Sequence, residues 1–138
     1  MIRRRKEPRW LDRAMVVAIH SDQIQQHGGL HGIRDVAGLE SALGRPRNRW
    51  SYESEVELEA IAASYGFGVT RNHPFVDGNK RTGFQVMYVF LGLNGWRIQA
   101  TDAEVVELME GVASGSVTEA ALASWLREHM IRQRKGKP

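Results

Sequence analysis

A polar stretch from residue 73 to residue 81 holds the side chains with the most evident chemistry. It reads His-Pro-Phe-Val-Asp-Gly-Asn-Lys-Arg, so a few residues supply an imidazole, a carboxylate, a carboxamide and two adjacent cations. An uncharged, largely apolar run follows from residue 82 to residue 93. A polar loop that leads into an apolar helix brings free backbone N–H groups, the positive end of the helix dipole and side-chain cations to one point. The 73–81 motif therefore predicts an anion site, and phosphate is the usual anion at such sites.

Transfer of a phosphoryl or nucleotidyl group is the chemistry that these residue types could perform. It needs a phosphate held in line, neutralisation of its charge, a metal ion and an acceptor for the proton of the nucleophile. His73 is the candidate general base, because imidazole exchanges protons readily near neutral pH. Asp77 is the candidate ligand of Mg²⁺, which prefers one or two carboxylates together with phosphate oxygens and water. Gly78 allows the backbone to approach an anion closely, and successive N–H groups there can form an anion-binding nest.

Asn79, Lys80 and Arg81 are the candidate phosphate-binding side chains. The carboxamide can donate to a phosphate oxygen, the ammonium adds a point charge, and the guanidinium adds a planar pair of donors. The parts of the motif also have ordinary structural explanations. A single histidine before a helix often caps it, Asp-Gly-Asn often marks a turn, and Lys-Arg in a first turn is often a solvated pair. The joint pattern is much less expected by chance than any of its parts.

The distribution of charge separates the ends of the chain from its body. A length of 138 residues is enough for one domain with one core, which we expect to span residues 1–138. The net charge is +3, but nine of the 19 Lys and Arg residues lie in residues 1–6 and 127–138. Residues 7–126 hold the other ten, against 15 of the 16 Asp and Glu residues, so the body is acidic. We therefore predict basic, flexible tails at about residues 1–8 and 132–138, and we do not expect nucleic-acid binding.

The sequence gives no sign of export or membrane insertion. It has no cysteine, and its longest uncharged run, from Thr82 to Trp96, has 15 residues, whereas a membrane span needs about 20. Residues 1–6 are basic, but no apolar run of signal-peptide length follows them. We therefore expect a cytoplasmic protein without a membrane partner.

The spacing of the apolar residues predicts an all-α fold, a compact bundle of about six helices. The run after the motif is apolar on almost every side, which predicts a central, buried helix. The expected helices span residues 10–26, 36–44, 54–71, 78–93, 101–113 and 119–132.

Several residues predict where these helices begin and end. Asp35 and Thr118 are expected N-caps, and Thr101 with Glu104 forms the pattern of a capping box. Pro46 predicts that the second helix ends before it and that residues 45–50 form a loop.

The 73–81 motif resembles the signature of the Fic/Doc family, and specifically of its Doc (death-on-curing) branch. Other segments look similar in order and spacing: the Ile19-His20 pair, the glycine-rich segment (residues 28–35), residues 39–43 with Arg45-Pro46, and residues 90–95. The resemblance covers residues 13–128. It implies the Fic/Doc fold, with ATP or another nucleoside triphosphate and Mg²⁺ as cofactors.

Two positions bear on the reaction that the resemblance implies. Typical Fic enzymes transfer AMP from ATP to a target hydroxyl, and their signature has glycine in place of Lys80 and a second arginine in place of Phe84. The same two departures are typical of Doc, which binds the nucleotide the other way round and transfers the γ-phosphate to a threonine of elongation factor Tu, halting translation. The resemblance therefore implies a toxin with protein kinase activity. Transfer of AMP or another nucleotide on the same site is one alternative, and a catalytically silent binding module acting through the basic tails is another.

The resemblance supports the roles given above for the motif residues and adds others. Arg71 and Arg34 are weaker candidates for contacts with the nucleotide or the target, and the glycine-rich segment would dock the target. His20 could face the site or be an ordinary core histidine.

The sequence also bears on regulation. Many Fic proteins are restrained by an inhibitory helix with the pattern Ser/Thr-x-x-x-Glu-Gly/Asn. The nearest match runs from Ser51 to Glu55, but Val56 follows where Gly or Asn is required. A Doc-like toxin without such a helix is expected to be neutralised in trans by an antitoxin of the Phd type, whose disordered tail folds on it.

Overall fold

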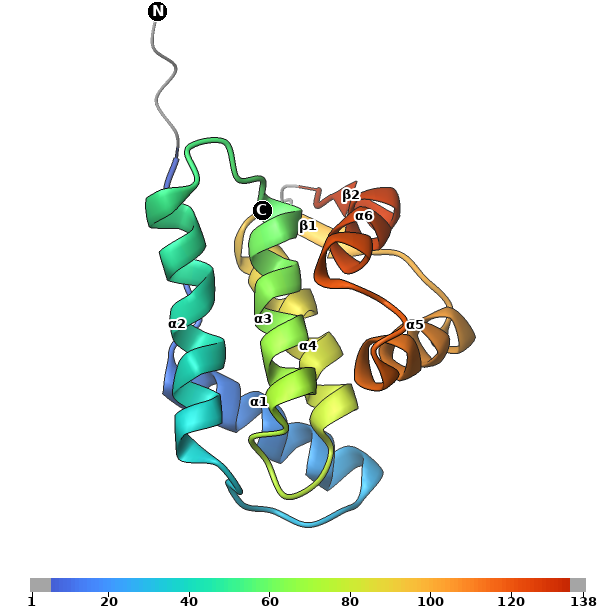
Figure 1. Ribbon diagram of the computed structural model, residues 1–138. Coiled ribbons are helices and arrows are strands. Elements are labelled where there is room, and N and C mark those ends of the chain that lie inside the picture. The colour runs from blue at the N-terminus through green and yellow to red at the C-terminus, as the bar shows by residue number, and fades with distance from the viewer. Residues whose placement is uncertain (1–5, 135–138) are drawn as a thin grey trace, which may run out of the picture.

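Six helices make up most of the residues that the computed structural model describes, residues 6–134 (Figure 1). The predicted all-α architecture is confirmed, with one small two-stranded sheet in addition. Residues 1–5 and 135–138 of the predicted tails lie outside the described residues. In chain order the elements are α1 (Arg13–His27), α2 (Val36–Tyr52), α3 (Leu58–Asn72), α4 (Asn79–Leu93), β1 (Trp96–Ile98), α5 (Asp102–Ser114), α6 (Glu119–His129) and β2 (Met130–Arg132).

The helices α3 and α4 form the centre of the bundle. Figure 1 shows α2 on one side of α3, α5 and α6 on the other side, and α1 crossing the end where α3 and α4 are joined. The close approach of the central helices depends on glycines. A side chain at Gly66 would overlap Met87 of α4, and a Cβ atom at Gly68 would lie 3.0 Å from the Cβ of Ala42 in α2. Such contacts bring backbones together at the cost of about 1 kcal/mol of helix propensity per glycine.

The prediction of a central, buried helix after the motif is confirmed. One strip of α4 does reach solvent, because Tyr88 is 40% exposed and Leu93 is 36% exposed. The apolar side chains of α4 that are almost completely buried are Phe84, Val86, Met87, Phe90 and Leu91.

The predicted end of α2 before Pro46 is wrong, and the helix continues to Tyr52. Proline removes one backbone donor, but Pro46 itself is buried. The turns around it are held from outside the helix. Arg45 and Arg49, one on each side of the proline, both reach Glu119 of α6, with N–O distances of 2.6 and 3.0 Å. Arg49 also donates to the carbonyl of Ala60 in α3.

Three further boundaries differ from the prediction, and the first of them is the start of α1, which is Arg13 and not residue 10. The third helix begins at Leu58, not near residue 54, and the last helix ends at His129, not at residue 132. The chain after His129 is extended and pairs antiparallel with β1, with Arg132 opposite Trp96. The Arg132 guanidinium lies over the Trp96 ring, 4.9 Å from its centroid. This strand was missed because three residues give no measurable period.

The predicted helix caps are confirmed. The Asp35 carboxylate accepts a hydrogen bond from the N–H of Gly38, and Thr118 accepts from the N–H of Ala121. Thr101 and Glu104 form both hydrogen bonds of the capping box. Among the described residues, no helix combines the length and apolar character that a membrane span requires.

Candidate active site

The motif loop (residues 73–78) joins α3 to α4 and is held by the glycine-rich segment (residues 28–35). Ile33 and Phe75 form an isolated antiparallel bridge. The N–H of Val76 donates to the carbonyl of Gly32 at 3.0 Å. The carbonyl of Pro74 accepts from the N–H groups of residues 34 and 35, at 2.7 and 3.0 Å. The two segments therefore form one surface at the end of the molecule where α1 crosses, as Figure 1 shows.

His73 ends α3 in a left-handed backbone conformation, with φ 53° and ψ 52°. It is the single non-glycine residue with a positive φ among residues 6–134. Such strain is held in place by the surroundings and often occurs at functional sites. Arg34 provides part of this restraint, because its Nε donates to the carbonyl of His73 at 2.8 Å and its Nη2 donates to that of Asn72 at 3.2 Å. The His73 side chain is exposed.

Gly78 begins α4, also in the left-handed region, with φ 74° and ψ 21°. A Cβ atom there would lie 2.9 Å from Cδ1 of Ile24, so α1 packs directly against this residue. The first N–H groups of α4 follow it and have no partner within the helix.

Asn79 is buried, and its carboxamide is bonded to the backbone of the motif loop. Its Oδ1 accepts from the N–H of Phe75, and its Nδ2 donates to the carbonyl of Phe75, both at 3.0 Å. Asn79 therefore fixes the shape of the loop from within.

The Asp77 carboxylate is kept ionised by backbone donors. The N–H of Leu30 donates to Oδ2 at 3.2 Å, and the N–H of Gly78 donates to Oδ1 at 2.9 Å. These hydrogen bonds, that of Leu30 first, lower the pKa of Asp77. Each oxygen keeps a free lone pair, so the carboxylate fits the demand of Mg²⁺ for an ionised oxygen ligand. Within residues 6–134, no three Asp, Glu, His or Cys side chains gather as a ligand set. Mg²⁺ at Asp77 would take its other ligands from phosphate and water.

The three cations around the motif each have a local partner. Lys80 pairs with Glu110 of α5 at 2.8 Å, and Arg81 donates to the carbonyl of Gly28 at 3.0 Å. The ion pair of Lys80 is exposed on both sides and contributes little to stability, so the ammonium can exchange Glu110 for a phosphate. Arg71 donates to the carbonyl of Ala113 at 2.8 Å and holds the end of α5 beside the loop.

These groups surround one cavity of about 470 Å³, the motif cavity. It brings together every candidate residue of the sequence except Arg34, which acts on the loop from outside. The lining residues are Thr70, Arg71, His73, Val76, Asp77, Gly78, Asn79, Lys80, Arg81 and Ala113.

A second, more apolar hollow, the α4–α5 groove, adjoins the motif cavity. It has a volume of about 520 Å³ and shares Lys80 and Arg81 with the motif cavity. Its apolar lining residues are Phe84, Val105, Val106 and Met109.

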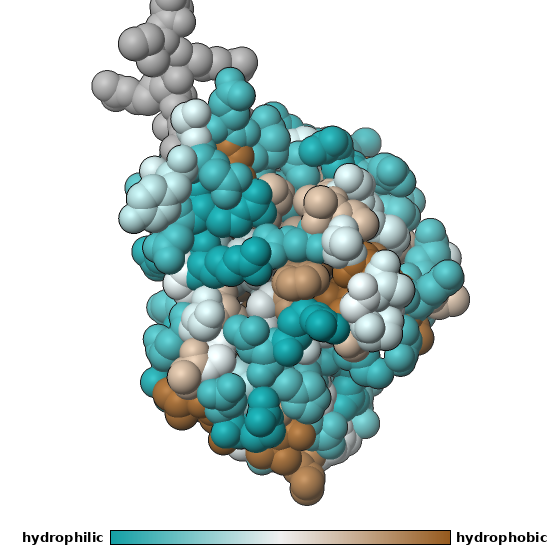
Figure 2. All heavy atoms as spheres, in the orientation of Figure 1, coloured by the Kyte–Doolittle hydropathy of each residue, from teal (hydrophilic) through white to brown (hydrophobic). Residues whose placement is uncertain are grey.

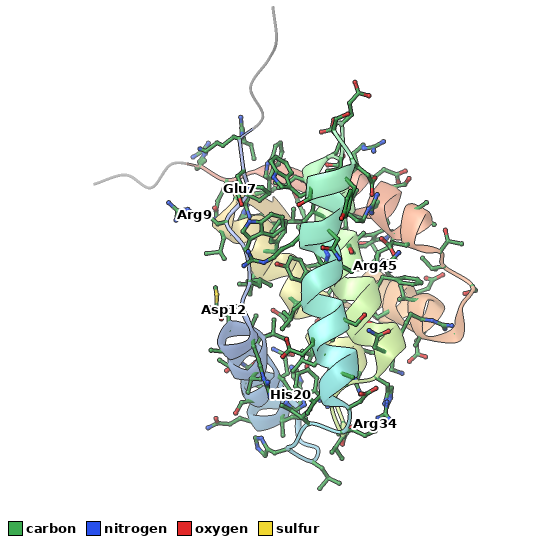
Figure 3. All side chains as sticks on the ribbon, turned by 60° about the vertical axis from the view of Figure 1, so that its left-hand side comes forward. Glu7, Arg9, Asp12, His20, Arg34 and Arg45 are labelled. Atoms are coloured by element: carbon green, nitrogen blue, oxygen red, sulfur yellow. The ribbon has the colours of Figure 1, made fainter. Side chains whose placement is uncertain are left out.

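One residue that the sequence left ambiguous, His20, contacts the motif loop from α1. Its side chain is buried and its ring lies parallel to that of Phe75, with 3.9 Å between centroids. Its Nε2 is 2.8 Å from the carbonyl oxygen of Asp77. Burial lowers the pKa of His20, which favours the neutral ring. Figure 3 shows His20 and Arg34 at the same end of the molecule.

A helical bundle with this motif at the start of its central helix defines a class of protein. Comparison with known families shows which class it is. Residues 10–91 match the Fic/DOC family, and the chain belongs to the Fic/Doc family. Two relatives place it in the Doc branch. It is 34% identical to Protein kinase doc of Escherichia phage P1 over 113 residues, which are 81% of this chain and 88% of that protein. It is 36% identical to Toxin Doc of Mycolicibacterium smegmatis over 90 residues, which are 63% of this chain and 69% of that protein.

Proposed function

We propose that this protein is a Doc-type toxin that transfers the γ-phosphate of ATP to a hydroxyl group of a cytoplasmic translation factor, elongation factor Tu. The names of its relatives, Protein kinase doc and Toxin Doc, support this assignment. The observation that carries it is the motif cavity, where His73, the ionised Asp77 and the start of α4 with its two cations meet.

The proposal gives each residue a distinct task. His73 is exposed at the mouth of the cavity and would accept the proton of the attacking hydroxyl. The N–H groups at the start of α4, with Lys80 and Arg81, would hold the phosphates and offset their charge. Mg²⁺ bound at Asp77 would supply further charge neutralisation. Asn79 and Arg34 keep the loop in shape.

Phe84 favours phosphate transfer over AMP transfer. Fic proteins that transfer AMP carry a second arginine at this position, whereas Phe84 is 9% exposed and packs near Tyr88 with 6.4 Å between ring centroids. The wall beyond Arg81 is therefore apolar and has no second guanidinium to hold a triphosphate in the orientation for AMP transfer.

The proposal is tested by intact-mass analysis of elongation factor Tu after incubation with this protein, ATP and Mg²⁺. We expect a mass gain of one phosphate group, and no gain with His73→Ala. A gain of one AMP group would establish nucleotidyl transfer instead. No gain from the wild-type protein would reject elongation factor Tu as the target and favour the silent binding module.

We also propose that an antitoxin of the Phd type neutralises the protein by binding the α4–α5 groove. A peptide helix with an apolar face would cover Val106, which is 60% exposed, and an acidic residue on it would reach Lys80 and Arg81. Bound there, it would withdraw both cations from the motif cavity.

Co-expression tests the antitoxin proposal. The neighbouring gene should restore growth to cells that make the wild-type protein but not to cells that make Val106→Glu. Tyr52→Glu, at a site that is 87% exposed and does not line the groove, is the matched control and should still be neutralised. Equal growth with and without the neighbouring gene would rule out this partner.

A further inference from the structure

His20 makes two contacts with the motif loop that restrain both its ring and its polar edge. The ring is stacked on Phe75 with an angle of 5° between the planes, and the residue is 3% exposed. The Nε2 atom is 2.8 Å from the carbonyl oxygen of Asp77. Because a carbonyl oxygen accepts hydrogen bonds and cannot donate, Nε2 must carry the proton.

The hydrogen bond from His20 fixes the orientation of the peptide group between Asp77 and Gly78. The described peptide bonds are all trans, so the C=O and N–H of this group point in opposite directions. The carbonyl points into the protein toward His20. The N–H therefore points the other way, toward the Asp77 carboxylate, which lines the motif cavity.

Nothing in the local sequence prevents this peptide group from turning over. A flip changes ψ of residue 77 and φ of residue 78, and glycine adopts either sign of φ at almost no steric cost. The hydrogen bond between the Gly78 N–H and Asp77 Oδ1 lies within adjacent residues and would be lost in a flip. The restraint from α1 is different, because it comes from 57 residues away and belongs to the packed core.

We propose that His20 is a positioning residue that keeps the Asp77–Gly78 peptide group in the orientation needed for anion binding. A flipped peptide group would point its carbonyl oxygen toward the carboxylate and the bound phosphate, where it would repel both. His20 acts through the loop and contacts neither phosphate nor hydroxyl. The consequence for catalysis rests on the proposed phosphoryl transfer, but the structural claim does not.

Two substitutions separate the donor from the ring. His20→Phe keeps a stacked ring without a donor, and His20→Gln keeps a donor near the position of Nε2 without the ring. His129 provides the matched control. It is also stacked on an aromatic ring, that of Trp125 at 3.8 Å, and its Nδ1 is 2.7 Å from a backbone carbonyl, but it does not line the motif cavity.

We expect His20→Phe to lower kcat by about 10- to 100-fold with little change in KM, the effect of a misplaced catalytic group. His20→Gln should stay within about threefold of wild type, and His129→Phe should leave kcat unchanged. If His20→Gln loses as much activity as His20→Phe, or if His20→Phe keeps wild-type kcat, the proposal is overturned.

An NMR measurement tests the same claim without any activity. In ¹⁵N-labelled protein, His20→Phe should shift or broaden the amide resonance of Gly78, and His20→Gln should restore it. An unchanged Gly78 resonance in His20→Phe would overturn the proposal even if the wild-type protein transfers no phosphate. Thermal unfolding of every variant is recorded, and His20→Leu, which also lacks a donor, replaces His20→Phe if that variant does not fold.

Discussion

The polar side chains of the 73–81 motif all line the motif cavity, but they fall into two groups, those whose polar atoms are bonded to the loop backbone and those whose polar atoms are exposed. Asn79 is in the first group, since its carboxamide satisfies both backbone groups of the buried Phe75. Lys80 is in the second group, because its one ion pair is exposed. The two neighbours therefore make different contacts in the structure, and phosphate binding by both stays a prediction.

This division predicts different losses on truncation. Asn79→Ala should lower the free energy of unfolding by about 2–4 kcal/mol, because it leaves two buried backbone groups of Phe75 without partners. Lys80→Ala should change it by less than about 1 kcal/mol while it weakens binding of ATP. Urea unfolding and nucleotide titration of both variants check this. A loss of nucleotide affinity in Asn79→Ala without a loss of stability would show that the carboxamide binds the ligand directly.

The contiguous residues of the site could be predicted from the sequence, whereas its contacts with distant segments could not. The groups around the motif cavity could be predicted because most of them are contiguous, and a loop before a helix has a known physical effect on anions. The contacts of His20 and Arg34 could not be predicted. They join segments 57 and 39 residues apart, and no local pattern specifies which carbonyl a buried donor will meet.

At the scale of elements, local signals predicted the helices where no distant contact opposed them. Asp35, Thr101 and Thr118 begin their helices as expected. Pro46 failed as a helix end because the side chains that stabilise the following turns come from another helix. The prediction of helix at residues 130–132 failed for a related reason. These residues form a strand because they pair with β1, which follows α4 and is distant in the sequence.

The continuation of α2 depends on Glu119. This residue pairs with Arg45 and Arg49, and its side chain is 14% exposed. Glu119→Gln should lower the free energy of unfolding by about 2 kcal/mol, because Arg45 loses its carboxylate partner and Arg49 keeps only its pair with Glu53, so the tie from α2 to α6 is weakened in a partly buried site. Glu40→Gln is the control, since the Arg13–Glu40 pair is half exposed on both sides and should contribute little. Equal urea midpoints for the two variants would contradict this account of α2.

The capping box of α5 makes the stability of the fold depend on pH, because it contains the carboxylate of Glu104. The N–H of Thr101, and then the Thr101 side chain and His129, lower the pKa of Glu104 below its ordinary 4.5. A lowered pKa in the folded state means that the carboxylate stabilises the fold above its unfolded pKa and loses this effect as the pH falls through its folded pKa.

Comparison of wild type with Glu104→Gln measures this effect, because glutamine can occupy a capping box but does not titrate. The urea midpoint of wild type should exceed that of the variant at about pH 6, and the difference should shrink as the pH falls below the ordinary 4.5 and through the lowered pKa of Glu104. A difference that stays constant with pH would mean that the carboxylate's ionisation has no part in the cap.

In the whole molecule, the motif cavity lies away from the first residues that the structure describes. Figure 3 shows Glu7 and Arg9 at one end of the bundle and His20 and Arg34 near the other. The backbone of Arg9 bonds to the side chain of Asn94, and the N–H of Gln133 donates to Gly95. Both terminal segments are thus fixed on the turn after α4.

Figure 2 shows mostly hydrophilic residues on the face it presents, with hydrophobic residues right of the centre and at the lower end of the view, where Figure 1 places α1 and the two loops.

This separation predicts the effect of removing the basic ends. A protein without residues 1–5 and 135–138 should retain wild-type kcat/KM for phosphoryl transfer and the same modest dependence on salt. A binding module acting through those residues would instead lose its effect, and its binding would decline steeply with salt. The assay is run on both proteins at low and high ionic strength. Loss of activity in the shortened protein would favour the binding module.

The left-handed backbone of His73 has a practical consequence for capturing the natural target. An inactive variant used to trap the substrate must keep the surface that binds the target unchanged while it removes the proposed proton acceptor, His73. Asparagine is enriched severalfold at positive φ, so His73→Asn should preserve the loop and retain bound target in a pull-down. A β-branched replacement such as His73→Val cannot easily adopt φ 53°. It would change the conformation of the motif loop, and the variant would no longer retain the target in the pull-down.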